Sequence, residues 1–231
     1  MALGSVSTLL EDVGAAVWRA DALSPVASAD GVALPSGHAA LDAQLPGGGW
    51  PVGALCEILQ AHSGQHEWRL LLPALRALQQ TVVLVGAPHA PFGPGLAAQG
   101  LNVQALLWIQ ADGVSERLWA AEQVLRCAGV DALLVWLPQV RSDPLRRLHL
   151  AAQAHAKLLF VMRPADAQNE SSPAILRLQV QAQATDDALQ VQLLKRRGPP
   201  LAQTLTLPAR HAPLRVLLEC THALDRPAAN A

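Results

Sequence analysis

Short runs of mostly apolar residues recur through the middle of this 231-residue chain. A strand that is apolar on both faces is buried on both faces, which is typical of a parallel sheet with helices on each side. We predict strands at residues 55–59, 81–85, 105–109, 132–137 and 157–162. We predict helices between them at residues 67–80, 95–99, 114–127 and 143–156. Strands that alternate with helices in this way indicate an α/β fold built from βαβ units.

The pattern of side chains changes after residue 174. Residues 175–183, 189–194 and 203–207 alternate apolar and polar side chains, and the pair Asp186-Asp187 separates the first two segments. Such alternation is typical of strands with one exposed face, which occur in antiparallel sheets. We therefore predict a mostly parallel sheet flanked by helices, with antiparallel edge strands near the C-terminus.

Composition divides the chain into a core and two short extensions. Residues 5–20 carry an apolar stripe with helical spacing, and residues 21–33 have the small residues and the proline of a linker. We assign residues 1–30 to an N-terminal helix and linker, residues 31–218 to one core domain and residues 219–231 to a flexible tail. A chain that is 51% hydrophobic has enough apolar side chains for a single core of this size.

Charge and cysteine content exclude several classes of protein. Charged residues make up 15% of the chain and the formal net charge is -1, which does not fit a basic nucleic-acid-binding protein. Cys56, Cys127 and Cys220 are odd in number and far apart, so they match neither a disulfide framework nor a zinc ribbon. The N-terminus lacks a signal-peptide pattern and no apolar run approaches about 20 residues, so we expect a cytoplasmic protein without a membrane span.

Two segments carry a resemblance to a known family. Leu34-Pro-Ser-Gly-His-Ala-Ala-Leu-Asp42, followed by Gly47-Gly-Gly-Trp-Pro-Val-Gly-Ala-Leu-Cys-Glu-Ile58, resembles the approach to the phosphate loop of the RecA recombinases. The combination GGGWPxGALxEIL, LLLPAL and a later LLKRRG resembles ImuA more specifically, the RecA-like accessory protein of bacterial translesion-synthesis cassettes. The resemblance covers about residues 31–208 and implies a RecA-like fold. SulA, a cell-division inhibitor with a RecA-like fold, is a more distant relative.

The residues needed for ATP hydrolysis on such a fold are missing. A phosphate loop wraps phosphate with backbone N–H groups, a lysine neutralises charge, and a hydroxyl helps to hold Mg²⁺. The resemblance puts Gly64 at the last loop glycine, Gln65 at the lysine and His66 at the hydroxyl. It puts Pro88 at the carboxylate that activates water and Trp136 at the aspartate that orients a metal-bound water. We therefore expect a degenerate nucleotide site with no catalysis, no bound cofactor and no metal ion.

The densest basic cluster is Lys195-Arg196-Arg197. A short basic run is usually a solvated turn, which is the plainer interpretation of this one. The resemblance adds a second interpretation, because basic residues of RecA filaments reach from this place to the nucleotide of the neighbouring subunit. Lys195 and Arg197 stand at those positions. The hypothesis is that the protein docks on one end of a RecA filament and cannot continue it.

Three further residues are candidates for contacts with partners or nucleic acid. Arg141 and Arg163 lie in the two segments where RecA carries its DNA-binding loops, and they could make a low-affinity, salt-sensitive contact with single-stranded DNA. The second segment, residues 163–173, reads as a flexible loop. Trp18 lies in the N-terminal helix, which either contacts another protein or covers the core of its own domain.

The ImuA resemblance implies a non-catalytic accessory protein of a damage-induced translesion-synthesis complex. Its partners would be an ImuB-type Y-family polymerase relative, an error-prone DnaE-type polymerase and the RecA filament, with no membrane partner. Three alternatives stay open: a SulA-like inhibitor that binds FtsZ, a DNA-dependent ATPase of RecA type with low activity, and a nucleotide sensor that binds without cleaving. The sequence leaves open the oligomeric state and the surface that binds each partner.

Overall fold

The computed structural model describes residues 32–183, 188–199, 201 and 203–208. The predicted N-terminal helix with Trp18, the predicted turn at Asp186-Asp187 and the predicted tail at residues 219–231 lie outside the described residues. The three-part assignment of the chain therefore stays a prediction. No helix in the described ranges is both long and apolar enough to cross a bilayer.

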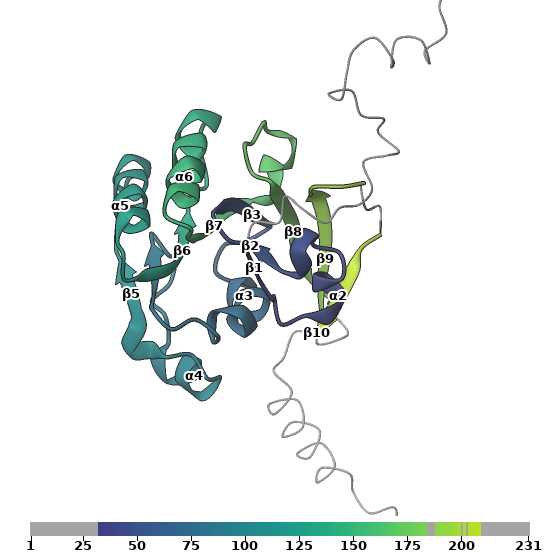
Figure 1. The fold of residues 1–231 in the computed structure, drawn as a ribbon, viewed down its shortest axis with the longest axis horizontal. Helices are drawn as coiled ribbons and strands as arrows, with labels where there is room; N and C mark the ends of the chain where they lie inside the picture. The colour runs from purple at the N-terminus through teal and green to yellow at the C-terminus, as the bar shows by residue number, and fades with distance from the viewer. Residues whose placement is uncertain (1–31, 184–187, 200, 202, 209–231) are drawn as a thin grey trace, which may run out of the picture. The chain divides into compact units, whose positions relative to one another are not determined.

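Eight strands form the main sheet of the described chain, in the order β10-β9-β8-β3-β7-β6-β4-β5 (Figure 1). Their bounds are β3 (Ala54–Gln60), β4 (Thr81–Val85), β5 (Leu106–Ile109), β6 (Val130–Trp136), β7 (Leu158–Pro164), β8 (Leu176–Ala182), β9 (Ala188–Lys195) and β10 (Leu205–Pro208). Neighbours from β8 to β5 pair in parallel, whereas β9 pairs antiparallel with β8 and β10 with β9. A separate antiparallel pair joins β1 (Ala33–Leu34) to β2 (Trp50–Pro51). The predicted fold class is confirmed.

Helices cover both faces of this sheet (Figure 1). The first core layer holds α2 (Ala39–Asp42), α3 (Glu67–Leu75) and α4 (Gly93–Ala98), and the second holds α5 (Val114–Arg126) and α6 (Ser142–Ala154). Short 3-10 helices are η2 (Pro46–Gly48), η3 (Val103–Ala105) and η4 (Ala165–Asn169). Each predicted helix and strand that falls within the described ranges is present, and the ends of most of them are displaced by a few residues.

Strand β3 shows why the buried runs look uniformly apolar. Successive side chains of a strand point to opposite faces, and here each face is covered. Cys56 and Ile58 pack in the α3 layer, whereas Leu55 packs against the α5 and α6 layer. Glu57 is a charged residue in this apolar run. It is fully buried, and it points to the same face as Leu55.

The prediction that the helix beginning at residue 67 continues to residue 80 is wrong at its C-terminal end. Helix α3 ends at Leu75. The backbone N–H groups of Gln79 and Gln80 donate instead to Asp131 Oδ2, at 3.1 and 2.8 Å. This contact directs the chain out of the helix and into β4.

The segment before β3 packs tightly on the α3 side of the sheet. A Cβ atom at Gly37, whose φ is +81°, would overlap Pro73 in α3. A Cβ atom at Gly49 would overlap the carbonyl group of Leu34. Trp50 is fully buried and packs edge-on against Phe160, with ring centroids 5.2 Å apart. The glycines of this segment are therefore required by close approaches of the backbone.

Strands β7 and β8 both pair with β3, and the connection between them contains η4 in place of an α-helix. Parallel strands of one sheet are usually joined by a helix that satisfies its own backbone hydrogen bonds. Residues 165–175 have little such regular structure. Their backbone groups need other partners, which the buried charges described below supply.

Candidate functional site

The loop at residues 61–66 joins β3 to α3 at the carboxyl edge of the parallel strands. In open α/β sheets this edge is where ligands bind. Gly64 has a φ of +91°, and a Cβ atom there would lie 2.6 Å from the ring of His89 and 3.1 Å from Pro88. The segment that follows β4 therefore covers the loop at Gly64.

The carboxylate of Glu67, the first residue of α3, turns back into this loop. Glu67 is only 1% exposed. Its Oε1 accepts hydrogen bonds from Gly64 N at 2.7 Å, Trp136 Nε1 at 2.9 Å and Gln60 Nε2 at 2.5 Å. Its Oε2 accepts a hydrogen bond from His66 N at 3.1 Å. The N–H groups that would bind phosphate in a phosphate loop bind the chain's own carboxylate here.

Gln65 and His66 do not fill the loop. Gln65 is exposed and His66 is half-buried. Burial, with a smaller contribution from the charge of Arg69, lowers the pKa of His66, so its imidazole is biased to the neutral form. The side chain that occupies the loop, and that the sequence analysis did not single out, is Glu67. Its position in the first helical turn, where acidic residues are favoured, was the available signal.

Trp136 ends β6, and its buried indole reaches the loop through the hydrogen bond to Glu67. Arg117 of α5 lies beside it, because Arg117 Nη1 donates to the Trp136 carbonyl at 3.0 Å and Nε donates to the Ala111 carbonyl at 2.8 Å. The Arg117 side chain also occupies the space next to Gly86. An indole from β6 and a guanidinium from α5 thus lie at this edge of the sheet. The described residues contain no cluster of His, Cys, Asp or Glu side chains that could hold a metal ion.

The basic cluster Lys195-Arg196-Arg197 lies at the end of β9. Lys195 is exposed and its Nζ donates to the Ser172 carbonyl at 3.1 Å. Arg196 Nη1 donates a hydrogen bond to the carbonyl of Gln44, which follows α2, whereas Arg197 is exposed. Lys195 pairs in register with Arg177 near the start of β8, and β8 runs parallel to β3. The basic cluster therefore lies at the amino ends of the parallel strands, whereas the Glu67 loop lies at their carboxyl ends.

His149 of α6 lies near this basic cluster. Its Nδ1 accepts a hydrogen bond from the backbone N–H of Leu55 at 3.1 Å, which requires that nitrogen to be unprotonated. Burial lowers the pKa of His149, and the positive charges of Arg197 and Lys195 lower it further. The neutral imidazole is therefore part of the folded structure.

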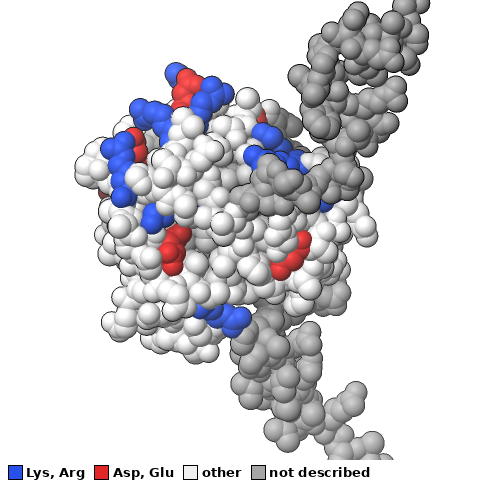
Figure 2. Space-filling model, viewed as in Figure 1, with Lys and Arg blue, Asp and Glu red and all other residues white. Residues whose placement is uncertain are grey.

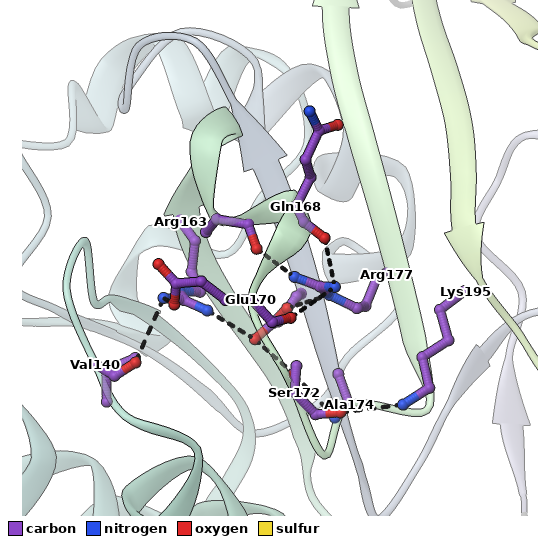
Figure 3. Close-up of polar contacts among 10 residues, drawn as sticks. Val140, Arg163, Gln168, Glu170, Ser172, Ala174, Arg177 and Lys195 are labelled. Atoms are coloured by element: carbon purple, nitrogen blue, oxygen red, sulfur yellow. Dashed lines mark hydrogen bonds and ion pairs between the residues drawn. The ribbon is translucent and has the colours of Figure 1, made fainter.

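Arg163 lies in the interior, which corrects the hypothesis that it contacts DNA phosphate. Its side chain is fully buried and pairs with Glu57 at 3.5 Å and with Glu170 at 2.6 Å (Figure 3). It also donates to the Val140 carbonyl at 3.4 Å. A guanidinium engaged in this way has no surface to offer a backbone phosphate. Arg141, by contrast, is exposed just before α6, and its contact with nucleic acid stays a hypothesis.

The segment after Arg163, which the sequence predicted to be flexible, is fixed by Arg177. The Arg177 Nε donates to Glu57 Oε2 at 2.6 Å, and its two terminal nitrogens donate to the carbonyls of Ala167, Gln168 and Glu170 (Figure 3). Ser172 Oγ donates to Glu57 Oε1 at 2.8 Å. A buried charge network therefore replaces the missing helix between β7 and β8.

The surface charges do not form a continuous basic stripe on the face shown in Figure 2. Lys and Arg side chains stand in small groups there, with acidic side chains among them and uncharged surface between. A nucleic-acid-binding domain usually gathers its basic residues on one face or along one helix. This distribution agrees with the formal net charge of -1.

Comparison with known proteins finds sequence similarity to SulA and to RecA. The chain is 32% identical to the cell division inhibitor SulA of Edwardsiella piscicida over 98 residues, which cover 41% of this chain and 58% of SulA. It is 32% identical to the protein RecA of Francisella tularensis subsp. novicida (strain U112) over 105 residues, which cover 44% of this chain and 29% of RecA. The matched parts thus span less than two thirds of either relative.

A solved structure supports the same fold. The RadB recombinase superposes with a TM-score of 0.61 at 15% identity, over 75% of this chain and 94% of that chain. No model of a known protein family matches the sequence. The chain is homologous to SulA and RecA, and it has a RecA-like α/β fold.

Proposed function

We propose that this protein is a non-catalytic, RecA-like accessory protein of a damage-induced translesion DNA synthesis complex. Its role is to recruit or bridge an ImuB-type Y-family polymerase relative, an error-prone DnaE-type polymerase and RecA or DNA. The observation that carries this proposal is the contact between Trp136 and Glu67. The Trp136 indole stands where an ATPase needs an acid that orients the metal ion, and the Glu67 carboxylate stands where an ATPase binds a phosphate.

Electrostatics supports the absence of catalysis. A triphosphate is stabilised in an ATPase by a lysine and a metal ion. Here the loop holds the carboxylate of Glu67, and a like charge a few ångströms away in a buried site repels a phosphate strongly. Gln65, at the position of the lysine, is uncharged and exposed.

The exposed basic residues support a role in docking. Head-to-tail assembly joins one edge of a subunit to a different edge of its neighbour. Lys195 and Arg197 are exposed at one edge of the sheet, and the loop at the other edge is filled by Glu67. A subunit of this kind joins a filament through its basic edge and offers no nucleotide to the next subunit.

Filament binding tests this role. We expect the double variant Lys195→Ala, Arg197→Ala to lose about tenfold or more in affinity for RecA filaments on single-stranded DNA with ATP, measured by co-sedimentation. The matched control is Arg146→Ala, Arg147→Ala on the exposed face of α6, which should bind as the wild type does. Equal binding by the first variant and the wild type would refute the docking hypothesis.

Nucleotide assays test the absence of catalysis. We expect no phosphate release from ATP with Mg²⁺ and single-stranded DNA when RecA is absent, and no shift in Tm with ATP and Mg²⁺. Turnover would favour a RecA-type ATPase. A saturable rise in Tm without turnover would favour the nucleotide sensor.

A SulA-like inhibitor is the second candidate function, and the 32% identity to SulA over 98 residues favours it. The two functions predict different partners. Purified FtsZ and a purified ImuB-type protein, offered to the immobilised full chain in parallel, separate them. Retention of FtsZ alone would replace the proposed function by the inhibitor.

A further inference from the structure

Glu67 is a buried carboxylate that forms no ion pair with any other residue that the structure describes. Its oxygens accept hydrogen bonds from four uncharged groups, which are the Gln60 amide, the Trp136 indole and the backbone N–H groups of Gly64 and His66. None of the ion pairs within the described ranges includes Glu67. A carboxylate removed from water is unfavourable unless strong hydrogen bonds replace its hydration. Free anions are held in proteins by the same means, through converging N–H groups.

Gln60 is a second, independent indication of an anion site. Its side chain is fully buried at the end of β3 and its Nε2 donates to Glu67, yet its Oε1 has no hydrogen-bond partner in the described part of the chain. An unpaired acceptor in the interior is unfavourable. The carboxylate of Glu67 satisfies only one end of this amide. A hydrogen phosphate ion would satisfy both ends, because it accepts from Nε2 and its own hydroxyl can donate to Oε1.

We propose that the loop between β3 and α3 is an anion-binding site whose resident ligand is the protein's own Glu67 carboxylate, and that hydrogen phosphate enters it when this carboxylate is removed. Glu67 holds the loop and Trp136 in a liganded arrangement without any nucleotide. The surfaces beside the loop therefore keep one arrangement whatever the nucleotide concentration. This inference goes beyond the proposed function, because it holds for any set of partners.

Chemical rescue tests the proposal. The full-length Glu67→Ala variant is denatured thermally in sodium phosphate, sulfate or chloride at equal ionic strength. We expect its Tm to lie below that of the wild type and to rise saturably with phosphate, by about 5–10 °C at about a hundredfold excess over Kd. Sulfate, which has no proton for Gln60 Oε1 at neutral pH, should give a smaller rise, and chloride none. If the variant is isolated unfolded, the yield of refolded protein in phosphate and in chloride is compared instead.

Two matched variants show whether the rescue belongs to this site. Glu67→Gln fills the same space without charge, so its Tm should fall and phosphate should not restore it. Glu116 also lies in the first turn of a helix and accepts a hydrogen bond from Gly113 N at 3.4 Å, but it is exposed. Glu116→Ala should show no rescue, because no buried amide or indole converges there.

The phosphate experiment gives one result that supports the proposal and two that contradict it. Rescue of Glu67→Ala alone, with phosphate above sulfate, supports the proposal. No rescue, or equal shifts in Glu67→Ala and Glu116→Ala, would overturn it. The filament experiment with Lys195 and Arg197 involves neither Glu67 nor the loop, so the docking function and this inference can fail separately.

Discussion

Two buried glutamates, ten positions apart in one strand–loop–helix unit, are stabilised in different ways. Glu57 is fully buried between the guanidinium groups of Arg163 and Arg177. Glu67 is 1% exposed, and the groups of the described chain that donate hydrogen bonds to it are uncharged. The first carboxylate is balanced by opposite charge and fixes the fold, whereas the second is surrounded as a bound anion would be. Burial alone therefore does not distinguish a carboxylate that stabilises the fold through ion pairs from one that occupies an anion-binding site.

Glu57→Ala should give the largest effect, because it leaves the buried guanidinium of Arg177 without its carboxylate and leaves Arg163 with Glu170 alone. Removing one partner of a buried ion pair typically costs about 3–5 kcal/mol of unfolding free energy. Urea denaturation measures this loss. The control is Glu170→Gln, whose side chain is 55% exposed, and the loss there should stay below about 1 kcal/mol. Equal losses for the two variants would show that Glu57 is not the centre of the network.

Glu67→Gln should give a smaller loss, about 1–3 kcal/mol, because no opposite charge is left unpaired and only hydrogen bonds to the carboxylate are weakened. The same urea experiment measures it. A loss as large as that of Glu57→Ala would remove the contrast between the two carboxylates. No loss at all would mean that the loop does not depend on Glu67.

Trp136→Phe removes one donor of the Glu67 site together with part of a buried ring. The lost hydrogen bond is worth about 1 kcal/mol, and the lost packing adds to it, so the free energy of unfolding should fall by more than about 1 kcal/mol. Trp119→Phe is the matched control, because Trp119 is 67% exposed on α5 and its replacement should leave stability unchanged. An unchanged stability for Trp136→Phe would indicate that Gly64 and Gln60 suffice to hold Glu67.

The smallest effect concerns pH on the α6 side of the sheet, where the positive charges of Arg197 and Lys195 act on His149. The pKa of His149 is lowered by burial and by Arg197 and Lys195, so it lies below the unfolded value of about 6.5. The stability that depends on neutral His149 is therefore fully present above about pH 6.5 and is lost as pH falls through the interval down to the folded pKa.

Lys195→Ala, Arg197→Ala should raise that folded pKa toward its ordinary value and flatten the acid side of the stability curve. Tm measured from pH 8 to pH 5 would check the slope, and the NMR titration of His149 would check its cause. A slope that is unchanged in the double variant would mean that burial alone lowers the pKa of His149.

The fold was predictable from the sequence because local patterns decide it. The run at residues 81–85, which is rich in β-branched residues, becomes β4 with the same ends, since the four side chains after Thr81 are apolar and buried and both faces are covered. Helix α3 is shorter than its periodicity predicts, because Asp131, far along the chain, accepts hydrogen bonds from Gln79 and Gln80. Helix and strand type follow from nearby residues, whereas the ends depend on distant ones.

The candidate site was less predictable for the same reason. Trp136 was identified as a replaced position, but its partner Glu67 lies 69 residues away and no local pattern joins the two. Arg163 was expected on the surface because its partner Glu57 is 106 residues distant. A charged residue within an apolar strand run, as Glu57 is, was the only local sign that buried partners had to exist.

The hydrogen bonds from Arg177 to the β7–β8 connection have a consequence for protein engineering. Arg177 holds that segment through the carbonyl oxygens of Ala167, Gln168 and Glu170, and every amino acid supplies such an oxygen. The side chain of Gln168 can therefore be exchanged without loss of this anchor. That position is a suitable place to attach a fluorophore or a cross-linker for mapping partners, because the backbone beneath it stays fixed.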